Sequence, residues 1–396
     1  MPNALIFSPN FNGHRQLHAF VYSCILRKIG YDIFIAGSFT TLDNSHAYTY
    51  MLAQDEKIIK INTSHYPEHG MKISNFDFLK LQNEHKIDLT VFVEADNQIS
   101  LIISQLICKN SRFRGKTVGL FLRPWYFYDK YNFKNSLVYI KGLRHTWKTD
   151  SDPRFFHKYL NSTFKLLDVS LYLDEFVVSK QRRSIYIPDI WQQYMNEVLR
   201  EENPQQRIWI DRLGRFKKIN PKSFIILYFG TAQKRRGYDD LLKLAVDNDT
   251  CFVHCGLMSY KDNYDLDVDE YRGILEKRGK LFETNEFITD TDCIHYYFKS
   301  VTHMVLPYDD SFFGSSGIML QALGYGIPVL VRDAGLVGGL VKKYKLGLTY
   351  GHDTLQKQFL EFKNRPCETF LNSITKYMEQ QSLDKFESVL LKAFKN

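Results

Sequence analysis

The sequence predicts an α/β protein with two successive open parallel sheets. Short apolar runs, of the kind found in strands buried on both faces, alternate with apolar residues at helical spacing. This alternation occurs twice, once over about the first 190 residues and again after residue 222, as in open α/β sheets. The chain has 396 residues, a length that suits two or three domains at roughly 100–200 residues each.

Composition excludes several other classes of protein. Hydrophobic residues make up 44% and charged residues 24% of the chain. These are globular values, and they exclude a disordered, collagen-like or coiled-coil chain. Lys and Arg total 52 and Asp and Glu total 44, which gives a net charge of +8. This mild excess suits an anionic ligand or an acidic membrane surface, and it is too small to indicate nucleic acid.

The sequence also predicts a cytoplasmic protein. The apolar residues Ala4–Phe7 have no basic region before them, so we do not expect a secretory signal peptide. No run of about 18 apolar residues is present. The 6 cysteines show neither CxxC pairs nor zinc-ligand spacing, so we expect reduced thiols and no metal.

The first half opens with a strand–helix–strand unit. The run Ala4–Phe7 predicts a strand, Leu17 to Ile29 a helix, and 32–37 the next strand. Four later apolar runs predict strands at 89–93, 117–121, 169–173 and 184–189. Between residues 129 and 156 the pattern gives way to aromatic and basic residues.

A polar stretch at 200–222 separates the halves, and we expect a boundary and hinge at 205–222. In the second half the expected strands are 224–230, 251–256, 282–289, 303–307 and 328–331. The expected helices are 238–247, 269–278, 293–298, 316–324, 354–363 and 367–394.

Two strand–helix junctions of the second half carry the pattern of an anion site. After the strand that ends at Phe229 come Gly230 and three consecutive cations, Lys234, Arg235 and Arg236. After the strand that ends at Pro307 comes the small-residue loop Gly314-Ser315-Ser316-Gly317, which opens a helix. Unpaired amides at a helix start and nearby guanidinium groups bind phosphate well. A solvated basic turn and simple N-capping are the alternative interpretations.

With these residues in view, the chain resembles the retaining, family-4 type of GT-B glycosyltransferase over nearly its whole length. The stretch from Ser315 to Val329, SSGIMLQALGYGIPV, is similar to the family's SG-x-x-x-EA-x-x-x-G-x-PV motif. Ile185–Asp189 resembles the family's IPNG segment, and Asn12-Gly13-His14 its N-terminal small-residue loop. A divergent subfamily carries the Ser-Ser-Gly version of the loop. The resemblance implies two Rossmann-like, doubly wound domains facing each other across a cleft.

The resemblance also implies roles for single residues. The family's two glutamates, eight residues apart, are replaced here by Phe313 and Gln321. Gln321 is expected at the nucleotide ribose, and Asp310 or its neighbour Asp309 is a candidate for the carboxylate at the donor sugar. The expected diphosphate site comprises Lys234, Arg235, Arg236, Ser315, Ser316 and Gly317.

Three residues of the first half are expected at the cleft. His14 is a candidate catalytic residue, and Gly13 and Arg123, together with Asp309, are expected to line the cleft. A structural histidine and a packed aromatic loop are the alternatives for His14 and Arg123. The triplet Asp265-x-Asp267-x-Asp269 resembles a metal motif of another fold, but it precedes a helix, whose dipole acids complement.

The implied organisation is an acceptor domain at 1–208, a donor domain at 209–375, and a helix at 376–396 that packs back on the first domain. The implied enzyme is a hexosyltransferase that moves sugar from a UDP- or GDP-sugar to a glycan or lipid-linked acceptor, with retention and without a required cofactor. An inactive nucleotide- or sugar-binding partner protein and a nucleotide-sugar epimerase are the alternatives. The basic, aromatic segment from Tyr126 to Lys148 is a candidate contact for the inner face of the membrane or a lipid-linked acceptor; the alternative is an irregular region packed over the sheet.

Overall fold

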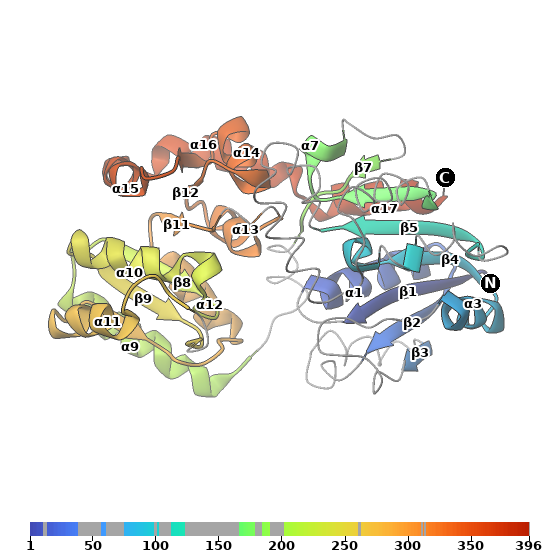
Figure 1. The fold of residues 1–396 in the computed structure, drawn as a ribbon, viewed down its shortest axis with the longest axis horizontal. Coiled ribbons are helices and arrows are strands. Elements are labelled where there is room, and N and C mark those ends of the chain that lie inside the picture. The colour runs from blue at the N-terminus through green and yellow to red at the C-terminus, as the bar shows by residue number, and fades with distance from the viewer. Residues whose placement is uncertain are drawn as a thin grey trace. The chain divides into compact units, whose positions relative to one another are not determined.

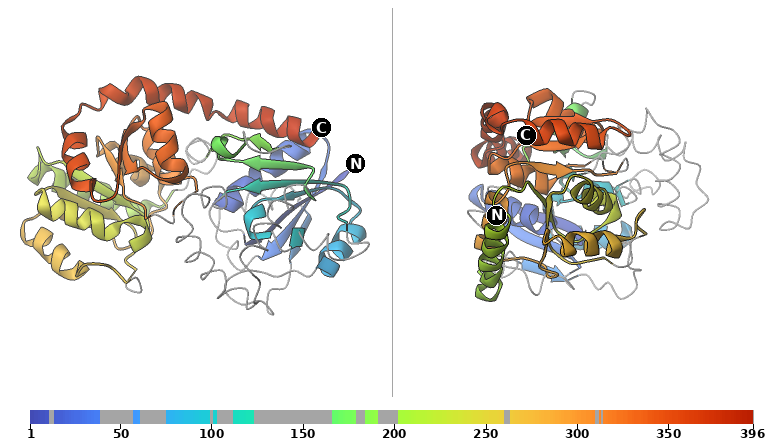
Figure 2. Two further views of the ribbon diagram at one scale, coloured as in Figure 1. Left: turned by 45° about the horizontal axis from the view of Figure 1, so that its top comes forward. Right: turned by 90° about the vertical axis from the view of Figure 1, so that its left-hand side faces the viewer.

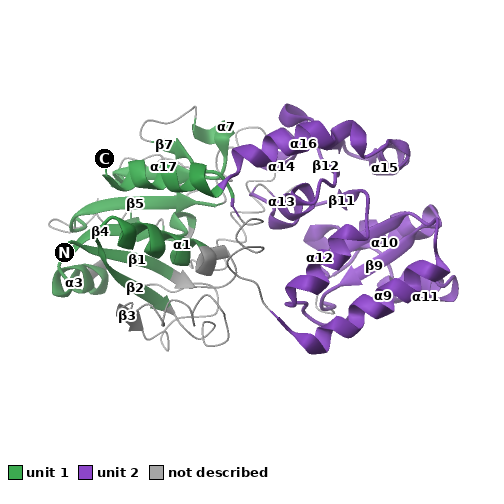
Figure 3. Cartoon of the chain, turned by 180° about the vertical axis from the view of Figure 1, so that it is seen from behind, with its two compact units in different colours: residues 1–189, 383–396 green, residues 190–382 purple. Residues whose placement is uncertain are grey.

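The computed structural model divides the chain into two compact units. Unit 1 comprises Met1–Asp189 and Leu383–Asn396, and unit 2 comprises Ile190–Ser382 (Figure 3). The structure describes residues 1–10, 14–38, 57–60, 75–98, 101–102, 112–122, 166–178, 184–190, 202–259, 263–309, 312 and 314–395.

Unit 1 is built on a seven-stranded sheet with the order β3-β2-β1-β4-β5-β6-β7 (Figure 1). All of its strand pairs are parallel. The strands are β1 (Asn3–Asn10), β2 (Asp32–Ser38), β3 (Lys57–Lys60), β4 (Ile87–Phe92), β5 (Lys116–Phe121), β6 (Val169–Tyr172) and β7 (Ser184–Tyr186). The described helices are α1 (His14–Lys28), α3 (Asn75–Glu84), η1 (Ala95–Gln98), α7 (Glu175–Val178) and α17 (Leu383–Lys395). A parallel sheet with connecting helices confirms the predicted α/β class.

The core of unit 1 is rich in aromatic side chains. Phe7 of β1, Phe92 of β4 and Phe78 of α3 are all fully buried. Their ring centroids lie 5.0 to 5.9 Å apart, in edge-to-face and stacked arrangements. Such pairs add about 0.5–1.5 kcal/mol each beyond the area that they bury.

Helix α17 completes unit 1, although it follows unit 2 in the sequence (Figure 2). Tyr22 of α1 lies 6.2 Å from the rings of Phe386 and Phe394. Lys116 of β5 donates hydrogen bonds of 2.7 and 3.2 Å to the last carbonyls of α17. Those carbonyls have no partner within the helix, so the lysine caps its negative end.

Unit 2 contains two three-stranded parallel sheets, β10-β9-β8 and β11-β12-β13, and β11 lies beside β8. The strands are β8 (Ile225–Phe229), β9 (Cys251–Cys255), β10 (Leu281–Glu283), β11 (Met304–Leu306), β12 (Val329–Arg332) and β13 (Gly347–Tyr350). The helices are η4 (Pro204–Arg207), α9 (Ile208–Ile219), η5 (Lys234–Arg236), α10 (Tyr238–Asp247), α11 (Val268–Lys277), α12 (Thr291–Lys299), α13 (Gly317–Gly324), α14 (Gly335–Tyr344), α15 (Leu355–Asn364) and α16 (Glu368–Gln380).

Several elements differ from the sequence-based expectation. The polar stretch expected as a boundary and hinge contains helices η4 and α9, because Leu213 is fully buried at the centre of an apolar stripe. The glycine-rich segment after Arg332 is helix α14. The single helix expected at 367–394 is two helices, α16 and α17, with a break at 381–382. The strand expected at 282–289 is shorter, and β3 and β13 were not anticipated.

Candidate functional site

The first junction of the candidate site joins β8 to α10. Gly230 has φ +111° and Gly237 has φ +70°, backbone conformations that favour glycine. Between them the short helix η5 presents the three cations Lys234, Arg235 and Arg236. A Cβ atom placed on Gly230 would lie 2.8 Å from Nη1 of Arg236. The glycine therefore gives the guanidinium room to lie against the backbone at the end of β8.

A partly buried cluster of His254, Glu283 and Arg272 supports this junction. His254 of β9 is fully buried, and its Nε2 lies 3.2 Å from the carbonyl oxygen of Gly230. Its Nδ1 lies 3.7 Å from Oε1 of Glu283, which also pairs with Arg272 at 2.5 Å. Burial raises the pKa of Glu283, but the hydrogen bonds from Arg272 and the nearby His254 outweigh this effect and lower that pKa to about 2. The carboxylate is therefore charged at neutral pH and anchors the turn through His254.

The second junction joins β11 to α13. Ser316 is the N-cap of α13, and its Oγ accepts a hydrogen bond of 3.1 Å from the amide of Met319. The same Oγ lies 2.7 Å from the hydroxyl of Tyr308. Burial raises the pKa of that hydroxyl above its usual value. The first turn of α13 contains no acidic residue, so no side-chain carboxylate of that turn offsets the positive end of the helix.

The two junctions meet. The amide of Asp309 donates a hydrogen bond of 3.1 Å to the carbonyl of Arg235. A Cβ atom on Gly237 would lie 2.3 Å from the carbonyl oxygen of Pro307, so the absence of a side chain permits this close approach. Arg236 and Arg235 also act on the Tyr308 hydroxyl, favouring its charged form. The structure thus brings the cationic loop beside the start of α13.

The three cations differ in their surroundings. Lys234 forms an ion pair with Asp265, which raises the pKa of the lysine. The backbone amide of Asp265 is in turn bound by Asp239, at 3.1 Å. No ion pair links Arg236 to a described carboxylate, and Arg235 is exposed. Arg236 is therefore the cation better placed to meet an anionic ligand.

The remaining predicted residues of unit 2 lie on or beside α13. Ser315 and Gly317 flank the N-cap and are partly exposed, and Gln321 lies one turn into the helix with only 4% of its surface exposed. The structure describes no side-chain hydrogen bond of Gln321 with the described residues. Its proposed contact with a ribose stays a prediction.

Several predicted residues lie outside the described part of the chain. These are Gly13, Arg123 and Asp310, and the segment from Tyr126 to Lys148. His14 is the first residue of α1, but its side chain is not among those described. The catalytic and cleft roles of these residues stay predictions.

The aspartates at 265, 267 and 269 each make a different structural contact. Asp267 is the N-cap of α11 and accepts a hydrogen bond of 3.0 Å from the amide of Glu270. Asp269 pairs with Arg272 at 2.9 Å, and Asp265 pairs with Lys234. Within the described ranges, no group of three or more His, Cys, Asp or Glu side chains is placed to hold a metal ion, and no helix has the length and apolarity that crossing a bilayer requires.

Sequence reasoning missed two residues that shape the site. Tyr308 directly follows the end of the apolar strand expected at 303–307, and this position at a strand end was the signal that could have identified it. His254 interrupts the apolar run Cys251-Phe252-Val253-His254-Cys255, and a polar residue inside a buried strand needs a partner. Neither signal identifies the partner, because Glu283 and Ser316 lie in other elements.

Neither a family model nor a curated protein sequence matches the chain, but solved structures do match its fold. A glycosyltransferase from Rickettsia africae superimposes with a TM-score of 0.64 at 10% identity, covering 100% of this chain and 97% of that chain. Anabaena Alr3699/HepE, solved in complex with UDP, gives 0.63 at 12% identity, with 100% of both chains covered. The fold is that of the GT-B glycosyltransferases.

The same fold also occurs in an enzyme of another class. UDP-GlcNAc 2-epimerase from Neisseria meningitidis, bound to UDP-GlcNAc, gives a TM-score of 0.56 at 14% identity and covers 100% of both chains. At such identities the likeness extends to the fold alone. The predicted pair of Rossmann-like domains is confirmed, and the chemistry has to be argued from the residues of this chain.

Proposed function

We propose that the protein is a glycosyltransferase that uses a nucleoside diphosphate sugar as donor. The observation that carries this proposal is the meeting of the two junctions in unit 2, through Asp309 and Arg235 and through Gly237 and Pro307. The anion would lie between the start of α13 and the guanidinium groups of Arg235 and Arg236. One solved neighbour of the same fold, Anabaena Alr3699/HepE, has structures in complex with UDP and with UDP-glucose, which supports a UDP-sugar donor.

The helix dipoles favour α13 over α10 as the diphosphate site. The first turn of α10 contains Asp239 and Asp240, and burial together with Asp239 raises the pKa of Asp240. These carboxylates already offset the positive end of α10 and would repel an anion. The start of α13 has no such carboxylate in its first turn, so its amides at Ser316 and Gly317 are the better partners for phosphate.

This arrangement would promote departure of the diphosphate. When the anomeric C–O bond breaks, negative charge grows on the leaving diphosphate oxygen, and fixed guanidinium and amide groups stabilise that charge more than they stabilise the bound substrate. Loss of one such donor commonly raises a reaction barrier by about 3–4 kcal/mol. Lys234 would contribute after it leaves Asp265.

The finer parts of the proposal follow the family resemblance. Gln321 would contact the ribose, Asp310 the donor sugar, and His14 the donor or acceptor, with Gly13, Arg123 and Asp309 beside them. The hexosyl specificity, the retention of configuration, the glycan or lipid-linked acceptor and the absence of a required cofactor belong to the same proposal. So does a cytoplasmic location with peripheral attachment to the inner face of the membrane.

Substitution of Arg236 tests the proposal. Arg236→Ala should weaken UDP binding by about tenfold or more, because a hydrogen bond to a charged group contributes about 1.5–3 kcal/mol. Isothermal titration with UDP and with uridine measures this, and the loss should appear with UDP only. Arg365→Ala is the matched control, since among the described residues the exposed Arg365 side chain, at the end of α15, forms an ion pair only with Glu361. Equal UDP affinity in the Arg236 and Arg365 variants would refute the diphosphate site.

Turnover separates the transferase from a non-catalytic binding protein. The second candidate is favoured by one observation, the replacement of the family's two glutamates by Phe313 and Gln321. We expect the purified protein to release UDP slowly from UDP-sugars even without an acceptor. Binding of the donor without any release or transfer would favour the binding protein, and conversion of the sugar itself would favour an epimerase.

A further inference from the structure

Helix α9 presents an unusual outward face. At 100° per residue, Ile208, Arg212, Arg215 and Ile219 fall within one arc of roughly 60°. An adjoining side of the helix packs on unit 2, with Leu213 fully buried and the rings of Trp209 and Phe216 lying 6.0 and 5.7 Å from that of Phe282. The arc therefore points away from the core.

Large apolar side chains are exposed on this face. Ile219 is 76% exposed and Ile208 is 55% exposed. Phe287, 60% exposed, lies beside the start of the helix, because Gln206 donates a hydrogen bond of 2.8 Å to its carbonyl and Trp209 donates one to Glu286. The two isoleucines are about 16 Å apart along the helix. Three of the most exposed apolar residues of the described chain thus lie on or next to one helix.

Cations are interspersed among these apolar residues. The helix carries Arg212, Arg215, Lys217 and Lys218 against a single acid, Asp211. The Arg212 guanidinium stacks 4.5 Å above the Trp209 ring, a cation–π contact that covers part of this aromatic surface. A helix with this mixture of exposed isoleucine and basic side chains is typical of proteins that lie on membranes.

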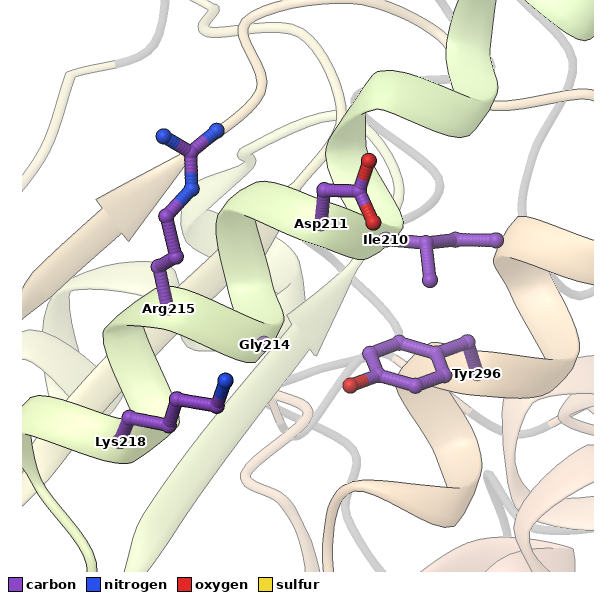
Figure 4. A pocket seen from close by; sticks show the side chains of 6 residues that line it. All are labelled: Ile210, Asp211, Gly214, Arg215, Lys218 and Tyr296. Atoms are coloured by element: carbon purple, nitrogen blue, oxygen red, sulfur yellow. The ribbon is translucent and has the colours of Figure 1, made fainter.

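A hollow of about 470 Å³ opens along one side of the same helix (Figure 4). It is lined by Ile210, Asp211, Gly214, Arg215, Lys218 and Tyr296. Gly214 leaves room for the hydroxyl of Tyr296, which would lie 3.3 Å from a Cβ atom placed there. Figure 4 shows this hydroxyl and the Lys218 ammonium directed toward the space beside Gly214, whereas the Arg215 guanidinium points away from it.

We propose that the outward face of α9 is a docking surface for an anionic lipid bilayer. Ile208 and Ile219, with Phe287 beside the start of the helix, enter the interfacial region, while Arg212 and Arg215 of the same arc hold lipid phosphates and Lys218 holds one at the hollow beside Tyr296. The charge of the helix selects this occupant, since an anionic bilayer is the partner that satisfies both the exposed apolar side chains and the cations. Its residues belong to another part of the sequence than Tyr126–Lys148, and docking there does not require a bound donor.

Co-sedimentation with vesicles tests the proposal. The wild-type protein should sediment with vesicles of phosphatidylcholine and phosphatidylglycerol, less so as salt is raised, and not with phosphatidylcholine alone. Arg212→Glu/Arg215→Glu should lower the partition coefficient by about tenfold or more, and Ile208→Ser/Ile219→Ser should lower it as well.

Lys357→Glu/Lys376→Glu is the matched control, because it changes the net charge equally through exposed lysines of α15 and α16. The proposal would be overturned if the control variant lost as much vesicle binding as the arginine variant, or if both α9 variants bound vesicles as the wild type does. It would also be overturned if the wild-type protein did not bind the anionic vesicles. Self-association that disappears only in the isoleucine variant would also overturn it, in favour of a second copy of the chain. UDP titration and melting temperature confirm that each variant is folded, and the vesicle assay contains no nucleotide, so its failure leaves the proposed donor site intact.

Discussion

The two strand–helix junctions of unit 2 meet at one place but are supported in different ways. The junction after β8 rests on a partly buried carboxylate, since His254 reaches the carbonyl of Gly230 and itself lies beside Glu283. The junction after β11 rests on neutral hydroxyls, those of Tyr308 and Ser316. The first presents cations, and the second presents helix amides without an adjacent carboxylate in the first turn.

The comparison shows how the proposed anion site would combine two unlike parts. Side-chain cations are mobile and need a rigid turn beneath them, which the buried cluster supplies. Helix amides are fixed already and need only a cap that does not carry negative charge. A serine N-cap meets that need, whereas an aspartate N-cap, as at Asp267 of α11, would repel phosphate.

Forcing the junctions apart should have the largest effect. Gly237→Ala combines a left-handed backbone, which costs about 1–2 kcal/mol for an L-residue, with overlap against the Pro307 carbonyl, which adds roughly 2 kcal/mol. Gly279→Ala is the control, because Gly279 has φ +66° but open space within 4 Å of the point where a Cβ atom would lie. Urea denaturation should show a greater loss of stability for Gly237→Ala, and UDP titration should show lost affinity for that variant alone. Equal affinities would mean that the contact between the junctions has no part in binding.

Removing the buried charge should have the next largest effect, and it should depend on pH. A lowered pKa means that Glu283 stabilises the fold fully above its unfolded pKa near 4.5 and that this stabilisation is lost as pH falls toward 2. Glu283→Gln should therefore lower the free energy of unfolding by about 3 kcal/mol at pH 7, with the difference shrinking below pH 4.5. Glu276→Gln, at an exposed site of α11, should change it by less than about 0.5 kcal/mol. A pH-independent difference in urea denaturation would contradict the role assigned to the carboxylate.

Loss of the serine cap should have a smaller effect on stability. Ser316→Ala and Asp267→Ala each remove one N-cap and should each cost about 1 kcal/mol of unfolding free energy. Only Ser316→Ala should weaken UDP binding, because it loosens the first turn of α13 and leaves the Tyr308 hydroxyl without this partner. Thermal unfolding measures the loss of stability in both variants, and UDP titration measures their affinity for UDP. Weaker UDP binding by Asp267→Ala would argue against a diphosphate site confined to α13.

The smallest expected change is a gain in affinity. Asp265→Asn should release Lys234 from its ion pair and strengthen UDP binding a few-fold, since exposed ion pairs contribute little and are screened by salt. Titration at low and high salt measures this, and the gain should be larger at low salt. Unchanged or weaker binding would show that Lys234 does not reach the ligand.

Elements with strong local patterns were predictable from the sequence. Helix α10 matches its expected bounds because apolar and polar residues alternate at helical spacing between Gly237 and Asn248. Helix α14 was missed because its glycines suggested a loop. The structure explains one of them by packing, since a Cβ atom on Gly338 would lie 2.6 Å from the Arg332 carbonyl, so this glycine marks close approach and does not mark a turn.

The candidate site was predictable in its location but not in its supports. The cations and the serine loop each follow a strand end, and carboxyl ends of parallel strands share one edge of a sheet. His254 and Glu283, by contrast, meet only through the pairing of β9 with β10, and Tyr308 meets Ser316 only through the path of the loop. Such pairs have no characteristic spacing in the sequence, so local reasoning does not identify them.

The place of α17 in unit 1 bears on how the protein is made. Residues 190–382 leave the ribosome before this helix does, so unit 2 has its whole sequence available while Tyr22 on α1 still lacks Phe386 and Phe394. Domains generally fold as units during synthesis. Unit 2 is thus able to fold first. Unit 1 can complete its fold only after α17 has been translated, and until then the aromatic surface of α1 that packs against α17 stays exposed.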